Sequence, residues 1–284
     1  MSRKNPIIVT GTAGTGTRVF SDLLECAGVF MGHRRNPTRD NLDFIAFVKD
    51  GIPISDKDSP LGDNFLNQAR STNYDPSVIR PLIQLRARSM VRQFSNKLLE
   101  DLKPEHYHWG WKESQSMFVL PFLLEVFPDL RLVHVVRDGR DMAFSNQQRA
   151  PFQVGYILSL MGLSAKPTND DIWARYVART WELTNVGVSD WAQRNLKSDQ
   201  YIVAKLEDLQ GNVLETTKTL FEKCEISVDD VAKCVEISGF DPPMLRLRKY
   251  KSRDKDVVRD IEQDVRIGLE KFHYQLEKNN LFHE

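Results

Sequence analysis

The sequence of 284 residues predicts an α/β protein of three layers, in which helices cover both faces of a central, mostly parallel sheet. Short apolar runs alternate with longer segments whose apolar residues recur at helical spacing. The first apolar run leads directly into a loop of glycine and threonine, typical of a P-loop-like phosphate-binding turn between a strand and a helix. We find no internal repeat and no linker-like stretch. Residues 1–284 are therefore predicted to form a single domain.

Each predicted strand is a short run rich in apolar residues, and the runs cover residues 7–11, 107–112, 131–137 and 201–205. A helix with its apolar residues on one side follows the first strand and ends near Gly28. Another is expected between Pro121 and Pro128, and the residues after 137 are expected to continue as a helix. Further helices are predicted over 78–101, 171–195, 211–224 and 257–276. The tryptophans of 171–195 fit a helix core better than a ligand platform.

The composition excludes several classes of protein. The 39 basic and 39 acidic residues balance, which argues against a protein that coats nucleic acid or lies on a membrane surface. Only three cysteines occur, without the spacing of a zinc site, and they indicate a reducing compartment. We see no signal peptide and no stretch near the ~20 apolar residues of a membrane span. The expected location is the cytoplasm.

The loop after the first strand, GTAGTGT, allows three interpretations. Gly11 and Gly16 have the separation of a Walker A loop, but Thr17 stands where that loop needs lysine. The order of Gly11, Gly14 and Gly16 does not match a dinucleotide-binding fingerprint either. The third interpretation is a phosphosulfate-binding loop. Thr15, Gly16, Thr17 and Arg18 match the usual ending of such a loop. In each case, backbone N–H groups and the start of a helix would hold an anion.

A second motif lies in residues 127–145, FPDLRLVHVVRDGRDMAFS. A buried strand delivers Arg137 at its carboxyl end, and Ser145 follows eight residues later. An arginine and a serine hydroxyl at that edge of a parallel sheet make a suitable site for a phosphate monoester. An ion-pair cluster of Arg137, Asp138, Arg140 and Asp141 is the alternative. The motif occurs together with the N-terminal glycine loop, at this distance along the chain, and the combination favours the phosphate site.

Together the two motifs resemble those of the sulfotransferases that use 3′-phosphoadenosine-5′-phosphosulfate (PAPS). The resemblance implies transfer of a sulfuryl group from PAPS to a hydroxyl or amine of a small-molecule or carbohydrate acceptor, without a metal. It implies that Gly14, Thr15, Gly16, Thr17 and Arg18 hold the phosphosulfate, and that Arg137 and Ser145 hold the 3′-phosphate. The segments WGWKE and YIVAKLEDL are also similar to segments of the family. The basic segment 248–253, which ends at Arg253, is similar to a family loop that closes over the 3′-phosphate and adenine, and a solvated basic turn is the alternative.

The resemblance also carries candidate catalytic residues. Family members place a cation early in the loop, where this sequence has Gly14. We hypothesise that Lys112 and Arg18 share the missing charge. Pairing of Lys112 with Glu113 or with a helix C-terminus is the structural alternative.

The proton of the acceptor needs a general base within hydrogen-bond reach. We favour Asp43, followed by Asp40 and His33, because similar enzymes draw their base from the region after the first helix. His106 and His108 are secondary candidates.

Two other functions stay open. A P-loop kinase of a small molecule would need ATP and Mg²⁺, and a PAPS-binding relative without turnover would explain the missing loop cation. Residues 31–100 are predicted to be an insertion that forms a lid or shapes the pocket of a polar or glycan acceptor.

Overall fold

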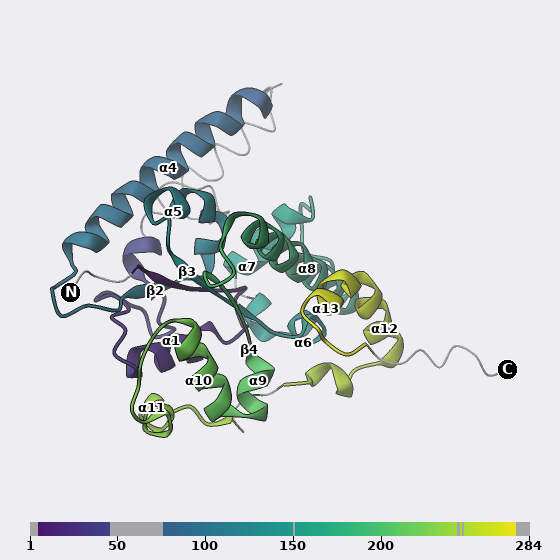
Figure 1. The fold of residues 1–284 in the computed structure, drawn as a ribbon. Coiled ribbons are helices and arrows are strands. Elements are labelled where there is room, and N and C mark those ends of the chain that lie inside the picture. The colour runs from purple at the N-terminus through teal and green to yellow at the C-terminus, as the bar shows by residue number, and fades with distance from the viewer. Residues whose placement is uncertain (1–4, 46–75, 150, 243–244, 246, 277–284) are drawn as a thin grey trace.

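The computed structural model describes residues 5–45, 76–149, 151–242, 245 and 247–276. Its centre is a sheet of four parallel strands in the order β2-β1-β3-β4, with helices above and below it (Figure 1). The strands are β1 (Ile7–Thr10), β2 (Gly110–Lys112), β3 (Arg131–Val136) and β4 (Tyr201–Lys205). The register places Val9 opposite Lys112 and Thr10 opposite His134. The predicted three-layer α/β fold with a parallel sheet is confirmed.

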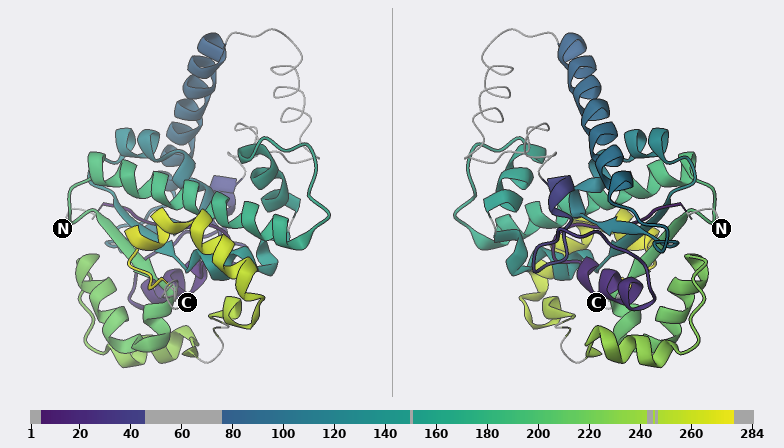
Figure 2. Two further views of the ribbon diagram at one scale, coloured as in Figure 1. Left: turned by 90° about the vertical axis from the view of Figure 1, so that its right-hand side faces the viewer. Right: turned by 90° about the vertical axis from the view of Figure 1, so that its left-hand side faces the viewer.

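One face of the sheet is covered by helices that follow β1 and β4. Ile7 and Val9 of β1 point to this face and pack with residues of α1 (Thr17–Cys26). The helices α9, α10 and α11 complete the layer (Figure 2). Their bounds are α9 (Leu206–Gly211), α10 (Val213–Lys223) and α11 (Val231–Ser238). Alternation along β1 sends Ile8 to the opposite face.

The opposite face packs against helices from the middle and the end of the chain. Ile8 and Trp111 lie in a core with α4, α5 and the second half of α8. The first half of α8 packs on α6, α12 and α13, with Trp181 at the centre as predicted. The bounds are α4 (Pro76–Glu100), α5 (Leu120–Val126), α6 (Gly139–Ala143), α7 (Pro151–Leu160), α8 (Asp170–Asn195), α12 (Lys255–Asp264) and α13 (Arg266–Lys271).

Three predicted elements differ from the structure. The predicted strand 107–112 is regular only from Gly110, because the preceding residues bridge to Phe30 instead. The helix after Arg137 ends at Ala143 and a 3₁₀ turn, Asn146–Arg149, follows, since the Ser145 hydroxyl accepts from the Gln147 N–H at 3.3 Å. The predicted helix 257–276 is divided at a buried valine into α12 and α13. The second starts where a Glu182 carboxylate oxygen accepts from the Gly268 N–H at 2.7 Å.

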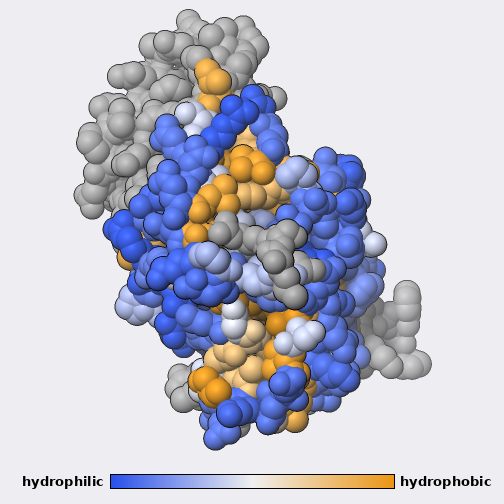
Figure 3. All heavy atoms as spheres, turned by 60° about the vertical axis from the view of Figure 1, so that its left-hand side comes forward, coloured by the Kyte–Doolittle hydropathy of each residue, from blue (hydrophilic) through white to orange (hydrophobic). Residues whose placement is uncertain are grey.

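The surface is mostly hydrophilic on the side that Figure 3 shows, and its apolar side chains gather in two separate areas. Across the described ranges, no helix is long and apolar enough to cross a membrane. The stretch 46–75 of the predicted insertion lies outside the described residues.

Candidate functional site

The candidate site lies at the edge of the sheet where all four strands end. The loop of residues 11–16 leaves β1 at this edge, and β3 ends one residue before Arg137. The Thr10 hydroxyl lies 3.0 Å from the carbonyl oxygens of both Glu113 and Ser114, which ties the end of β1 to the end of β2. Ligands of open parallel sheets bind at this edge. Both predicted motifs therefore reach the place where the fold favours a site.

The loop is a tight turn around two glycines in the left-handed region, Gly14 with φ 94° and Gly16 with φ 92°. The N–H and hydroxyl of Thr15 both donate to the Thr12 carbonyl oxygen, at 3.1 and 2.8 Å. Gly16 is the N-cap residue of α1 and has no side chain to accept from the first turn. The first N–H groups of α1 are thus left for an anion.

Glycine is required at position 16 for a second reason, which is a close approach to the start of α9. A Cβ atom on Gly16 would lie 2.5 Å from Leu206 Cδ1. We expect Gly16→Ala to lower the free energy of unfolding by about 1–3 kcal/mol, because it combines a strained backbone with a clash. Urea unfolding measures the loss.

Gly28→Ala is the matched control for this prediction. Gly28 has a similar φ of 85°, but nothing lies within 4 Å of the Cβ it would gain. A loss for Gly16→Ala no larger than that for Gly28→Ala would contradict the close approach to Leu206.

The two motifs are in direct contact. Arg137 is 8% exposed, and its guanidinium donates from Nη1 to the Gly14 carbonyl oxygen at 3.3 Å and from Nη2 to Asp141 at 3.0 Å. A Cβ on Gly14 would lie 3.0 Å from Ser145 Oγ. The Gln148 amide also donates to the loop, to the Ala13 carbonyl oxygen at 2.7 Å. The structure therefore brings Gly14, Arg137 and Ser145 together.

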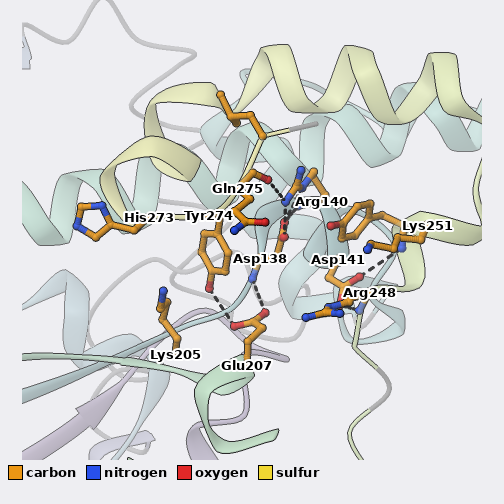
Figure 4. A pocket seen from close by; sticks show the side chains of 12 residues that line it. Asp138, Arg140, Asp141, Lys205, Glu207, Arg248, Lys251, His273, Tyr274 and Gln275 are labelled. Carbon is orange, nitrogen blue, oxygen red and sulfur yellow. Dashed lines mark hydrogen bonds and ion pairs between the residues drawn. The ribbon is translucent and has the colours of Figure 1, made fainter. Parts of the chain in front are cut away.

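The basic segment 248–253 is divided between two cavities. Arg253 lines the first with Ser145 and Arg149, and its guanidinium lies 4.8 Å from the centre of the Phe144 ring. Arg137 does not line this first cavity. Arg248 and Lys251 line the second cavity (Figure 4). Arg149, which the sequence analysis missed, is a further cation beside Ser145.

Lys112 is 4% exposed and lies at the end of β2, where its ammonium forms an ion pair with Asp40 and donates to the Thr38 carbonyl oxygen at 3.1 Å. The second Asp40 oxygen accepts from Asn36 Nδ2 at 3.0 Å and from the Thr38 hydroxyl. The Asn41 N–H donates to the Lys112 carbonyl oxygen at 2.9 Å, so this segment runs beside β2. Two predicted catalytic residues, Lys112 and Asp40, are thus in contact.

The other predicted catalytic residues have different partners from this pair. The Asp43 carboxylate pairs with Arg34 at 2.7 Å. The His33 ring lies 4.7 Å from the Phe30 ring and 6.1 Å from that of His106, beside residues that precede β2. Arg18 is exposed on the first turn of α1.

Glu113, which the sequence analysis considered only as a partner of Lys112, is 3% exposed and caps the 3₁₀ turn Ser114–Phe118 by accepting from the Gln115 N–H. Burial above all, and then the neighbouring Asp40, raise the pKa of this carboxyl to about 8 against the smaller opposing effects of the Gln115 N–H and Lys112. An acid after a strand is a common helix cap, so the sequence alone did not mark it.

The residues of the loop fit a phosphate-containing ligand. Thr12 Oγ1 is buried and has no hydrogen-bond partner in the part of the chain that the structure describes. The same turn leads into the uncapped start of α1, and Ser145 Oγ lies against its Gly14. The described residues contain no group of three or more His, Cys, Asp or Glu side chains arranged to hold a metal.

A parallel sheet with a glycine loop between β1 and α1 places the protein in the P-loop-like class of α/β folds. The sequence profile of the sulfotransferase family matches residues 6–230, and the chain belongs to that family. A search of curated protein sequences gives no match.

Solved structures share the fold at low sequence identity. Sulfotransferase STF9 from Mycobacterium avium has a TM-score of 0.55 and 16% identity, over 98% of this chain and 79% of that one. The sulfotransferase domain from the curacin biosynthetic pathway has a TM-score of 0.53 and 14% identity, over 97% and 100%. A sulfotransferase from Alicyclobacillus acidocaldarius has a TM-score of 0.51 and 13% identity, over 97% and 98%.

Proposed function

We propose that the protein transfers a sulfuryl group from PAPS to a hydroxyl or amine of a polar small molecule or glycan. The contact between the two motifs carries the proposal: Arg137 donates to the carbonyl oxygen of Gly14, and Ser145 lies against the same glycine. A donor with phosphates at its 5′ and 3′ positions would use both motifs at once. Membership of the sulfotransferase family supports the reaction type.

The residues of the loop would hold the 5′ end of the donor. Gly14 to Thr17 and Arg18 would surround it, with the N–H groups of α1 directed at its charge. Arg137 and Ser145 would hold the 3′-phosphate, and Arg253 lines a cavity that Ser145 shares. PAPS supplies a sulfuryl group attached to a phosphate, which is a good leaving group.

Asp40 is the general base in this proposal, in preference to Asp43 and His33. Of the three candidates, Asp40 contacts Lys112 at the end of β2, whereas Asp43 pairs with Arg34. Lys112 and the hydroxyl of Thr38 orient the Asp40 carboxylate, which would accept the proton of the acceptor hydroxyl or amine. The positive charge of Lys112 would also stabilise charge that develops during transfer.

Titration calorimetry with adenosine 3′,5′-bisphosphate, beside AMP, ATP–Mg²⁺ and NAD, tests the donor. We expect micromolar binding of the bisphosphate alone. Arg137→Ala is expected to weaken this binding at least about a hundredfold, because two charge-assisted hydrogen bonds are lost. Ser145→Ala is a milder variant, with a loss of about tenfold expected from one bond. Circular dichroism checks that both variants fold.

The outcomes separate this function from its alternatives. A preference for ATP–Mg²⁺ would replace the proposal by a kinase. Binding of the bisphosphate without transfer of radiolabelled sulfate from PAPS to any acceptor would favour a relative that lacks turnover. Failure of all four compounds to bind would contradict a nucleotide site at the two motifs.

A further inference from the structure

A third cavity, of about 330 Å³, lies among α5, α7, α8 and the 3₁₀ turn Ser114–Phe118. Its volume falls within the range of roughly 300–1,000 Å³ that small-molecule sites occupy. Neither the glycine loop nor Arg137, Ser145, Lys112 or Asp40 lines this cavity. It is therefore separate from the site of the proposed function.

The wall of this third cavity is mainly apolar. The described residues that line it carry no charge. Three of its large apolar side chains are exposed, Phe118 to 39%, Leu160 to 40% and Leu183 to 56%. They belong to the 3₁₀ turn, α7 and α8, so three elements contribute exposed apolar surface to one cavity. Single exposed apolar residues are ordinary, whereas a group around one hollow indicates a binding surface. The wall therefore favours an uncharged, mainly apolar ligand.

Two hydroxyl groups interrupt this apolar wall. The Tyr156 hydroxyl lies 3.2 Å from Thr184 Oγ1, and within the described residues neither forms another hydrogen bond. Each hydroxyl carries one hydrogen, and the bond between them uses one of the two. Burial raises the pKa of Tyr156, although the bond to Thr184 opposes the shift, so the phenol keeps its proton at neutral pH. One O–H group is thus left to donate to a ligand.

Gly187 forms an open part of the same wall. It lies inside α8, where glycine is less favourable than alanine. Its backbone is not left-handed, and nothing lies within 4 Å of the Cβ that a substitution would add. Neither backbone conformation nor packing against the described residues therefore requires glycine at this position. Because Gly187 lines the cavity, its missing side chain leaves room for a ligand.

We propose that this cavity binds an uncharged, mainly apolar ring compound with one oxygen that accepts a hydrogen bond, as in an aromatic ketone. The rings of Phe118 and Tyr156, with centroids 5.1 Å apart, and the indole of Trp191 favour a flat ring. The ring would lie beside Gly187, and the Tyr156 hydroxyl would donate to the ligand oxygen. Thr184, which is 7% exposed, would donate to the phenol oxygen and leave the phenolic hydrogen for the ligand.

Acetophenone is the probe, and ethylbenzene, which lacks the carbonyl oxygen, is the comparison compound. Neither has a hydroxyl or an amine, so neither can accept a sulfuryl group. Binding is followed by NMR titration of the isotope-labelled whole protein, with and without saturating adenosine 3′,5′-bisphosphate. We expect both compounds to bind under both conditions, with dissociation constants of about 1 mM or below, as suits ligands of this size.

Tyr156→Phe tests the hydrogen bond. It should weaken binding of acetophenone about threefold to tenfold, because one neutral hydrogen bond is lost. Binding of ethylbenzene should change by less than about twofold, since it has no oxygen to accept from Tyr156. A general disturbance of the wall would weaken the binding of both compounds, so the difference between them identifies the hydrogen bond.

Gly187→Leu tests the position of the site. The added side chain should fill the cavity and weaken the binding of both compounds at least about tenfold. Gly211→Leu is the matched control, because Gly211 ends α9, does not line the cavity, and likewise has nothing within 4 Å of an added Cβ. This control should bind both compounds like the wild type. Circular dichroism checks that all variants fold.

Four results would overturn the proposal. They are binding in Gly187→Leu as tight as in Gly211→Leu, equal effects of Tyr156→Phe on the two compounds, no binding by the wild type, and loss of binding when the bisphosphate is present. Sedimentation tests whether a second copy of the chain covers the cavity instead. A wild-type dimer that Gly187→Leu dissociates would replace the small molecule by that copy. Failure of the bisphosphate to bind would count against the proposed function alone, because the two probes do not depend on the donor site.

Discussion

Lys112→Ala is expected to reduce turnover with PAPS by about 10²–10³-fold, the usual effect of removing one group that stabilises developing charge. The substitution removes a buried ammonium and leaves the Asp40 carboxylate without its ion-pair partner. Stability should fall too, by about 3–5 kcal/mol, because one partner of a buried pair remains. Turnover is measured with radiolabelled PAPS, and stability by urea unfolding.

The catalytic part of this effect must be separated from the structural part. Lys112→Met fills a similar volume without the charge, and the affinity for adenosine 3′,5′-bisphosphate reports whether the loop is intact. A variant that binds the bisphosphate normally but turns over slowly supports a catalytic role for Lys112. Full turnover in Lys112→Ala would disprove that role.

Substitution of two aspartates, one at a time, identifies the general base in the same turnover assay. We expect Asp40→Asn to lose turnover and Asp43→Asn to keep most of it, because Asp40 pairs with Lys112 whereas Asp43 pairs with Arg34. The opposite pattern would support Asp43 as the general base, as the sequence predicted. Asparagine preserves the shape of the carboxylate at both positions, so the comparison concerns charge.

The sequence predicted the layers of the fold because local rules determine them. A buried apolar strand followed by a glycine turn and an amphipathic helix has few alternatives, and β1 to α1 formed as expected. Boundaries were less predictable where side chains compete with the backbone. Ser145 accepts from the Gln147 N–H and ends the helical course early.

The site was predicted only in part because several of its contacts join distant residues. The motif residues Gly14 and Arg137 could be paired from the topology of a parallel sheet, where strand ends meet. The choice of Asp40 over Asp43 could not be predicted from the sequence, because it depends on a turn that places Asp40 against Lys112. Nor does sequence spacing indicate that Arg248 has a left-handed backbone.

His134 lies in the middle of β3, fully buried, and links the sheet to α8. Its Nε2 lies 2.9 Å from Asn185 Oδ1, and its Nδ1 lies 2.9 Å from the Tyr201 hydroxyl. The Asn185 amide nitrogen donates to the Trp181 carbonyl oxygen at 2.7 Å, so Asn185 Oδ1 faces the ring as an acceptor. Nε2 therefore carries a proton, and in the neutral imidazole Nδ1 can accept from the Tyr201 hydroxyl.

Acid is expected to destabilise the protein through this histidine before most carboxylates titrate. Burial lowers the pKa of His134 from 6.5 to about 4, although the hydrogen bond to Asn185 opposes the shift. Between these values the unfolded chain binds a proton that the folded chain does not. Stability is then fully present above pH 6.5 and falls as the pH decreases toward 4. The free energy of unfolding should drop by about 2 kcal/mol between pH 7.5 and pH 5 from this residue alone.

His134→Gln isolates this contribution, because glutamine can donate to Asn185 and accept from Tyr201 without taking up a proton. Urea unfolding of both proteins at pH 7.5 and pH 5 measures the difference. We expect the wild type to lose about 2 kcal/mol more than the variant over that interval, since other titrating groups are shared. Parallel losses in the two proteins would mean that His134 is protonated in the folded state at pH 5. The hydrogen bonds between β3, β4 and α8 would then have to rearrange to accept the charge.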